Sequence, residues 1–179
     1  MDQRRIALIS TGGTIEKTYD ELRGVLENRV SVLDVMLDML VLEGVEIERV
    51  KLMNKDSLEM NAADHTEIAT VAIDLAATFE GVVIVHGTDR LAQTGDAVVS
   101  RTNHPPVPIV LTGAMRPYVM RTTDALQNLT EALLAVQLLT PGVYCAMHNQ
   151  VLPFPGVEKD RQRGTFIRKS PDGARTDPS

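Results

Sequence analysis

Tryptophan is missing from this chain of 179 residues, and other aromatic residues are few, with three Tyr and three Phe. The core must therefore be aliphatic, and the hydrophobic share of 44% is ordinary for a globular protein. A chain of this length buries enough surface to fold without covalent cross-links. We expect one domain over residues 1–170 and a disordered tail over residues 171–179, where two prolines stand among few apolar groups.

Cysteine is nearly absent as well. Cys145 stands alone, which excludes an intrachain disulfide and fits a reducing compartment. Its neighbours in 143–147 are apolar, so we expect a small core residue and not a nucleophile. The sequence also lacks an apolar run long enough to cross a bilayer or to direct secretion. These absences predict a cytoplasmic protein with no membrane partner.

Positive charge is in deficit, because 18 basic residues face 24 acidic ones and the formal net charge is −6. Binding to nucleic acid requires a clustered positive field, and an anionic membrane surface requires the same. We therefore expect a small-molecule substrate, and neither nucleic acid nor membrane as a partner.

Short β-branched segments alternate with helical patterns along the chain. We expect strands at 6–9, 45–52, 82–85, 107–111 and 143–147, and helices at 31–43, 62–80, 90–102 and 122–139. This order predicts an α/β fold of three layers, with a mostly parallel five-stranded sheet flanked by helices, as in flavodoxin-like proteins. Residues 11–30 and 149–170 do not follow the pattern, and we expect irregular structure there.

Polar, glycine-bearing segments follow the predicted strands at their carboxyl ends, where ligands bind in open α/β sheets. Thr14 follows the first strand, Ser57 the second, and Thr88 and Asp89 the third; Lys159 lies beyond the fifth. A threonine hydroxyl attacks an acyl group once a base takes its proton, and a lysine amine is a candidate base. Neighbouring glycines let backbone N–H groups stabilise an oxyanion. A hydroxyl, an amine, a carboxylate and backbone N–H groups at one edge of the sheet are the groups that acyl transfer requires.

Less specific interpretations exist for the same residues. Thr88 and Asp89 are favoured helix caps, and Lys159 between two acids is typical of a solvated loop. The segment 11–14 suits a phosphate-binding turn, but the chain contains neither glycine-rich phosphate motif. His86 after an apolar strand is typical of a satisfied core histidine. The remaining histidines show no metal-ligand spacing, so we expect no metal site: His65, His104 and His148.

Three ordered segments carry a family resemblance. Residues 8–15, 83–89 and 112–117 resemble signatures of the bacterial-type L-asparaginases, with Asp124 and Asn128 in familiar context. The resemblance covers roughly residues 4–170. It implies the fold of the family's N-terminal domain and hydrolysis of L-asparagine to L-aspartate and ammonia, with L-glutamine as the other possible substrate. It also implies that no metal or organic cofactor is needed.

The resemblance also implies roles for individual residues. Thr14 matches the primary nucleophile, and Tyr19 the tyrosine that activates it. Thr88, Asp89 and Lys159 match the family's second catalytic group. Ser57 falls where the family binds the substrate α-carboxylate. The residues expected to bind substrate are Gly13, Ser57, Glu59, Gly87, Thr88, Asp89 and Ala114.

Departures from the family pattern matter for function. Glu16 replaces a small residue and Arg90 a threonine, which puts long charged groups near the expected pocket. The family's second, C-terminal domain has no counterpart in this sequence, so we expect a homo-oligomer, a dimer, or local acids such as Glu59 to complete the site. Two other hypotheses stay open: a non-catalytic amino-acid-binding or sensing domain, and a flavodoxin-like nucleotide or phosphate module.

Overall fold

A six-stranded sheet forms the centre of the computed structural model, which describes residues 3–29, 31–102 and 104–169. The expected tail over 171–179 lies outside the described residues. Five strands run parallel, and the last runs antiparallel to its neighbour. In spatial order they are β4 (Val45–Lys55), β1 (Arg4–Gly12), β5 (Gly81–Val85), β6 (Pro108–Thr112), β7 (Gly142–Met147) and β8 (Gln150–Pro153).

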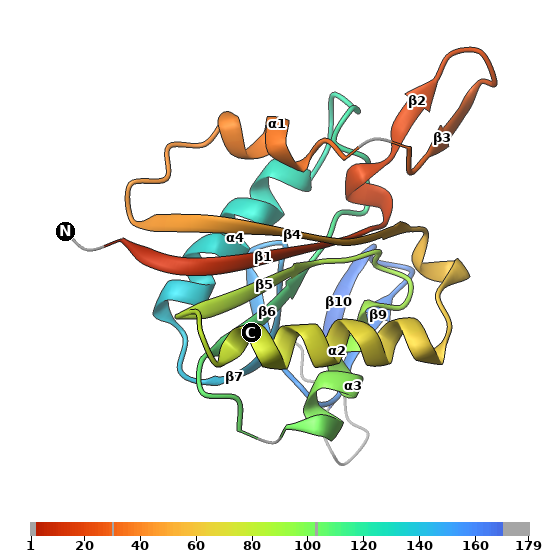
Figure 1. Cartoon of the computed structure of the whole chain (residues 1–179). Coiled ribbons are helices and arrows are strands. Elements are labelled where there is room, and N and C mark those ends of the chain that lie inside the picture. Colours follow the sequence, from red (N-terminus) through yellow and green to blue (C-terminus); the bar gives the residue numbers. More distant parts are fainter. Residues whose placement is uncertain (1–2, 30, 103, 170–179) are drawn as a thin grey trace.

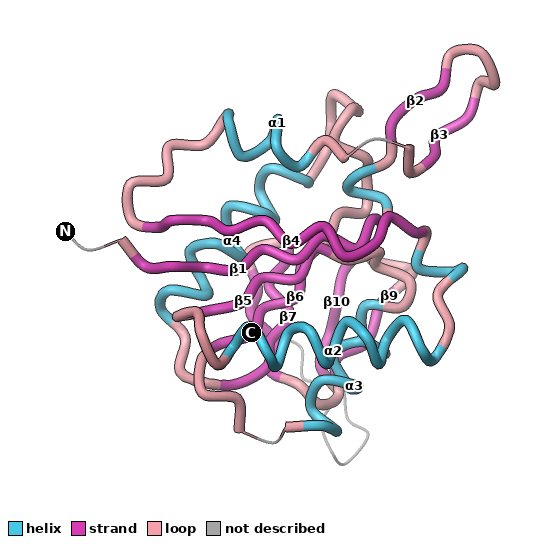
Figure 2. The backbone as a smooth tube through the Cα atoms, in the orientation of Figure 1, coloured by secondary structure: helices cyan, strands magenta, loops and turns pink. Residues whose placement is uncertain are grey.

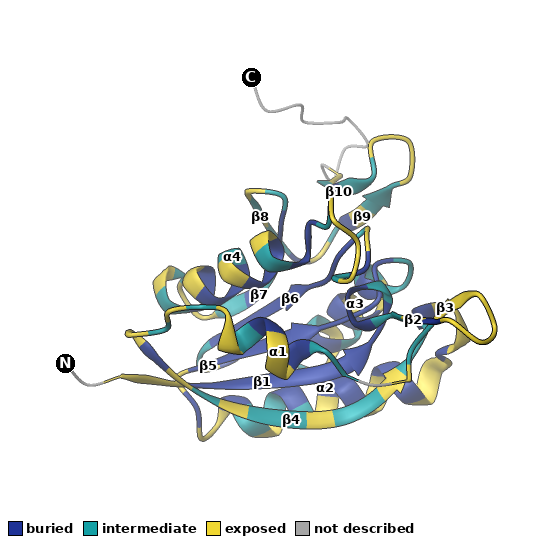
Figure 3. Cartoon of the chain, turned by 90° about the horizontal axis from the view of Figure 1, so that it is seen from above, coloured by how far each residue is buried: buried dark blue, intermediate teal, exposed yellow. Residues whose placement is uncertain are grey.

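Helices cover both faces of this sheet (Figures 1 and 2). One face packs against α1 (Leu33–Asp38) and α4 (Ala125–Leu138), and the other against α2 (Ala62–Ala76) and α3 (Leu91–Arg101). Alternate residues of β1 feed the two cores, because successive strand side chains point to opposite faces. Figure 3 shows the consequence: the central strands are buried, whereas β4 at the edge is partly exposed.

The three-layer α/β class expected from the sequence is confirmed, but the sheet has one strand more than the five expected. The extra strand is β8, in a segment that was expected to be irregular. A two-residue turn leads into it, with positive φ at His148 (54°) and Asn149 (59°). Such turns are usually marked in a sequence by a glycine, which is absent here.

Two further hairpins lie in the segments 11–30 and 149–170, where irregular structure was expected. Residues 18–27 form β2 (Thr18–Asp20) and β3 (Val25–Glu27), which project from the body in Figure 1. The second hairpin joins β9 (Val157–Asp160) to β10 (Thr165–Arg168). Both pairs are short and partly exposed, so they lack the long apolar runs by which buried strands are recognised.

The expected helices are present, with shorter bounds. The first ends at Asp38 and not at residue 43, although Leu40 and Leu42 still pack against the core from irregular backbone. Apolar spacing alone therefore overestimated its length. α2 starts where the Asn61 side chain accepts hydrogen bonds from two backbone N–H groups, while Asp64 bonds back to the Asn61 amide.

Candidate active site

Thr88, Asp89 and Lys159 form a hydrogen-bonded group at the carboxyl end of β5. The Lys159 Nζ atom donates to Thr88 Oγ1 at 2.8 Å and to Asp89 Oδ1 at 3.0 Å. Thr88 is buried, and the side chains of Asp89 and Lys159 are 22% and 16% exposed. A shielded amine in contact with a hydroxyl is an arrangement for proton transfer, and the carboxylate fixes the position of the amine.

Close backbone contacts bring the loops after β1 and β5 together. A Cβ atom built on Gly13 would lie 2.3 Å from the Gly87 Cα atom, and one built on Gly87 would lie 2.6 Å from Ser57 Oγ. Gly13 also has φ 83° and ψ −175°, a conformation that other residues avoid. The expected substrate-binding residues Gly13, Ser57 and Gly87 are thus in direct contact, beside Thr88.

The loop after β6 closes the same region. A Cβ atom on Gly113 would lie 2.3 Å from the His86 carbonyl oxygen and 3.3 Å from Thr88 Cγ2. Ala114, which was expected to bind substrate, is completely buried in the core on the α4 side. The loops after three strands therefore pack around Thr88.

Thr14 and Tyr19, the expected nucleophile and its activating residue, follow Gly13 in the chain. Thr14 begins a short 3-10 helix, η1 (Thr14–Glu16), directly after Gly13, and is half-buried. Tyr19 lies on β2 of the projecting hairpin and is 62% exposed. Its hydroxyl approaches the position of Gly24 within that hairpin. The structure brings the backbone beside Thr14 to Gly87, and leaves Tyr19 on the exposed hairpin.

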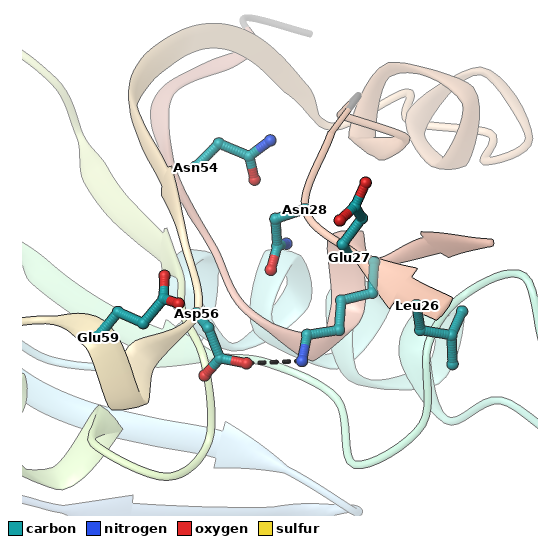
Figure 4. A pocket seen from close by; sticks show the side chains of 7 residues that line it. Leu26, Glu27, Asn28, Asn54, Asp56 and Glu59 are labelled. Carbon is teal, nitrogen blue, oxygen red and sulfur yellow. Dashed lines mark hydrogen bonds and ion pairs between the residues drawn. The ribbon is translucent and has the colours of Figure 1, made fainter. Parts of the chain in front are cut away.

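A polar pocket of about 310 Å³ lies at the base of the β2–β3 hairpin (Figure 4). Lys17 bonds to Asp56 at 2.6 Å across it, and Asn28 Nδ2 donates to the Gly13 carbonyl at 2.8 Å. Glu59, at the end of a second 3-10 helix, η2 (Ser57–Glu59), also lines the pocket. Hairpin, Gly13 loop and Ser57 segment are therefore tied together at this point.

The two unusual charged residues do not point freely into a pocket. Glu16 is buried, accepts hydrogen bonds from the Gly12 amide and the Ser31 hydroxyl, and has a pKa raised by burial. Arg90 donates to the Met60 carbonyl. The Glu16 carboxylate is thus hydrogen-bonded to the backbone of the turn that precedes Thr14.

A chain of hydrogen bonds supports the backbone before Thr88. His86 Nδ1 lies 2.8 Å from the Gly87 carbonyl, so this nitrogen carries the proton. His86 Nε2 then accepts from Thr94 Oγ1 at 2.8 Å, and Thr94 accepts from His65 Nδ1 at 2.6 Å. Burial lowers the pKa of His86 to about 4. His86 is a buried, hydrogen-bonded histidine, as its apolar surroundings in the sequence indicated.

A second network, which the sequence did not reveal, joins the loop after β6 to the β9–β10 hairpin. Asp124 accepts hydrogen bonds from the amides of Met115 and Arg116 and from His148 Nε2 at 2.7 Å. Burial raises the pKa of Asp124, but these hydrogen bonds outweigh it and lower the value overall. His148 Nδ1 reaches Thr165 Oγ1 at 3.0 Å on β10.

Arg161 forms an ion pair at the site that the sequence analysis did not predict. It stands in the turn between β9 and β10, and its Nη1 atom lies 2.9 Å from Asp89 Oδ1. The only signal in the sequence was its spacing of two residues from Lys159, which places it directly after the strand that carries the lysine.

Cys145 is completely buried, and burial raises the pKa of its thiol to about 12. Within 3–29, 31–102 and 104–169, no three His, Cys, Asp or Glu side chains gather as a metal site would require. No helix in these ranges is long and apolar enough to span a membrane.

Comparison with known proteins agrees with the signature segments. The sequence model of the family described as "Asparaginase, N-terminal" matches residues 5–170. The chain belongs to the asparaginase family. The resemblance that the three signatures indicated is therefore confirmed across almost the whole described chain.

The similar sequences include two kinds of protein, L-asparaginases and D subunits of glutamyl-tRNA(Gln) amidotransferases. The L-asparaginase of Thermococcus kodakarensis is 30% identical over 162 residues, which are 89% of this chain and 49% of that protein. The D subunit of the glutamyl-tRNA(Gln) amidotransferase of Haloquadratum walsbyi is 32% identical over 167 residues, 92% of this chain and 37% of that protein. The chain thus spans half or less of the length of these relatives.

Solved structures of the asparaginase family share the fold. The thermostable L-asparaginase from Thermococcus kodakarensis superposes with a TM-score of 0.83 at 30% identity, over 92% of this chain and 51% of that one. A probable cytoplasmic L-asparaginase from Campylobacter jejuni gives a TM-score of 0.79 at 28% identity, over 93% and 53%.

Proposed function

We propose that the chain is an L-asparaginase-type amidohydrolase that converts L-asparagine and water to L-aspartate and ammonia. The hydrogen bonds from Lys159 Nζ to Thr88 Oγ1 and Asp89 Oδ1 carry this proposal. A lysine that is only a solvated loop residue is not expected to contact a buried threonine hydroxyl. A lysine that transfers a proton to or from a reacting oxygen must lie within hydrogen-bond distance of it.

The proposed reaction has two steps. The Thr14 oxygen attacks the carbon of the substrate's side-chain amide, its proton is taken up, and the tetrahedral intermediate loses ammonia as the C–N bond breaks. Water then attacks the resulting ester, the C–O bond to Thr14 breaks, and L-aspartate leaves. Thr88, Lys159 and Asp89 move the protons, and the backbone N–H group of Gly87 stabilises the oxyanion. No metal or organic cofactor takes part.

Substrate recognition follows from the groups around this centre. Ser57 is 1% exposed and lies against Gly87, which supports the proposal that its hydroxyl binds the α-carboxylate. Asp89 offers a carboxylate to the α-ammonium, and Glu59 on the adjoining pocket adds a second acid. Tyr19 is 62% exposed on the β2–β3 hairpin, and its proposed activating role includes a movement of this hairpin toward the body.

The decisive test compares Thr14→Ala and Thr88→Ala with the unchanged protein in an ammonia-release assay on L-asparagine and L-glutamine. We expect both variants to keep their thermal unfolding midpoint and to lose at least about a hundredfold in kcat, because each removes a group that acts on the reacting atoms. Ser100→Ala, on the exposed side of α3, is the control. If the unchanged protein binds L-aspartate without hydrolysing either amide, it is an amino-acid-binding domain and the proposal fails.

The similarity to the D subunits of amidotransferases favours a second candidate. On this alternative the same site releases ammonia from an amide for use by a partner protein. A preference for L-glutamine, or activity only in the presence of such a partner, would favour it over the first. Our proposal further includes a homodimer as the active species and a cytoplasmic location.

A further inference from the structure

Asp89 holds two cations on one oxygen atom. Its Oδ1 lies 3.0 Å from Lys159 Nζ and 2.9 Å from Arg161 Nη1. The turn that carries Arg161 is well defined, because the Asp160 carboxylate accepts hydrogen bonds from the amides of Gln162 and Arg163. The guanidinium is therefore delivered to Asp89 by a structured turn.

The two cations differ in burial, and this difference separates their tasks. The Lys159 side chain is 16% exposed and also bonds to Thr88, whereas the Arg161 side chain is 69% exposed and approaches from the rim. An exposed ion pair contributes little to stability, so the guanidinium can leave Asp89 at small cost. Arg161 thus adds an exposed cation to the carboxylate that the proposed substrate's α-ammonium needs.

We propose that Arg161 determines substrate specificity by competing with the substrate α-ammonium for Asp89. This inference rests on the proposed function, because it assigns a substrate group to Asp89. An amino-acid amide that binds its α-ammonium to Asp89 meets the guanidinium as a competing cation. A dicarboxylic acid monoamide without an α-amino group leaves the Arg161–Asp89 pair in place, so that both cations stay beside Asp89 and attract its carboxylate.

The predicted signature is a change in the ratio between two substrates. L-asparagine and succinamate carry the same amide and carboxylate and differ only in the α-amino group. In Arg161→Ala we expect the KM for L-asparagine to fall about twofold to fivefold, the range that corresponds to one exposed ion pair. The kcat stays unchanged, because Arg161 does not reach Thr88. The KM for succinamate stays the same or rises.

Two further variants complete the comparison. Arg161→Lys keeps the positive charge and should retain the KM values of the unchanged protein. Arg101→Ala removes an equivalent exposed charge at the far end of α3 and should change neither KM. Thermal unfolding of each variant confirms the fold.

Binding of the matching acids tests the inference even where turnover is slow. Calorimetry with L-aspartate and succinate should give a tighter Kd for L-aspartate in Arg161→Ala and no gain for succinate. Equal shifts for both ligands, or no shift for L-aspartate, would overturn the role of Arg161. Absence of hydrolysis with the expected change in binding would overturn the proposed function and leave the competition at Asp89 standing.

Discussion

At the scale of single residues, the site depends on side chains whose burial decides their protonation. His86 is completely buried and donates its Nδ1 proton to the Gly87 carbonyl, so it must stay neutral for the hydrogen bond from Thr94 to persist. A charged imidazole would carry a proton on both nitrogens and could no longer accept from Thr94. The backbone before Thr88 therefore depends on the neutral form of one ring.

Stability should consequently fall in mild acid. Burial lowers the pKa of His86 to about 4, whereas an unfolded histidine titrates near its ordinary value of about 6.5. Between these values only the unfolded chain binds the proton, so the contribution of His86 is complete above about pH 6.5 and is lost as the pH falls toward 4. From pH 7 to pH 5 we expect a loss of about 2 kcal/mol in the free energy of unfolding.

Urea unfolding at the two pH values measures this loss. In His86→Gln, which cannot titrate, the pH dependence should shrink by the same amount. Proton NMR of the imidazole in the unchanged protein gives a second readout, because His86 should remain neutral down to about pH 4. An imidazole that titrates near pH 6.5 in the folded state would contradict the prediction.

At the scale of elements, the β9–β10 hairpin presents Lys159 and Arg161, and His148 joins this hairpin to the rest of the site. His148 lies in the turn between β7 and β8 and bonds to Asp124 on one side and to Thr165 of β10 on the other. The residue has positive φ, a strained conformation for a residue other than glycine. The strain and the double contact together indicate that this side chain positions the hairpin.

Removing the His148 side chain should loosen Lys159 without unfolding the protein. In His148→Gly the backbone strain is relieved and the link to Thr165 is lost. We expect kcat on L-asparagine to fall about fivefold with little change in KM, because misplacement of a catalytic group by a fraction of an ångström slows the reaction. Steady-state kinetics measures the split.

The neighbouring residue provides a matched control. Asn149 also has positive φ, and Asn149→Gly relieves the same kind of strain while it leaves the His148 contacts in place. It should retain full kcat. Equal effects of the two substitutions would assign the result to the turn and not to the His148 side chain.

The sequence predicted the elements of the central sheet far better than the hairpins. Strands such as β5, buried on both faces, carry a continuous apolar run that few other structures produce. The carboxyl-end rule then placed Thr14, Ser57 and Thr88 at one edge. The hairpins lack such runs, so the contacts of Lys159 and Arg161 with Asp89 depended on a register that only the three-dimensional structure supplies.

At the scale of the whole molecule, the β2–β3 hairpin projects from the body, and a polar pocket lies at its base (Figures 1 and 4). Several large apolar side chains are also exposed. They include Val35 in α1, Met39 and Val41 directly after it, and Leu22 and Leu26 on the β2–β3 hairpin. In the proposed homodimer these side chains are candidates for the contact surface.

A dimer that completes the site makes a prediction about dilution. Sedimentation velocity should show a species with twice the mass of the chain, and specific activity on L-asparagine should fall when the protein is diluted below its dissociation constant. Activity that stays proportional to concentration, from a species sedimenting as a single chain, would show that one copy is sufficient.

The pairing of β9 with β10 restricts how this protein can change over evolutionary time. Lys159 faces Phe166, and the residues on either side of it, Glu158 and Asp160, are both acidic. Because neighbouring strand residues point to opposite faces, an insertion or deletion of one codon within β9 would present an acid to Thr88 in place of the amine. Drift in length should therefore be confined to the hairpin tip around Gly164, where the surroundings of the chain are open.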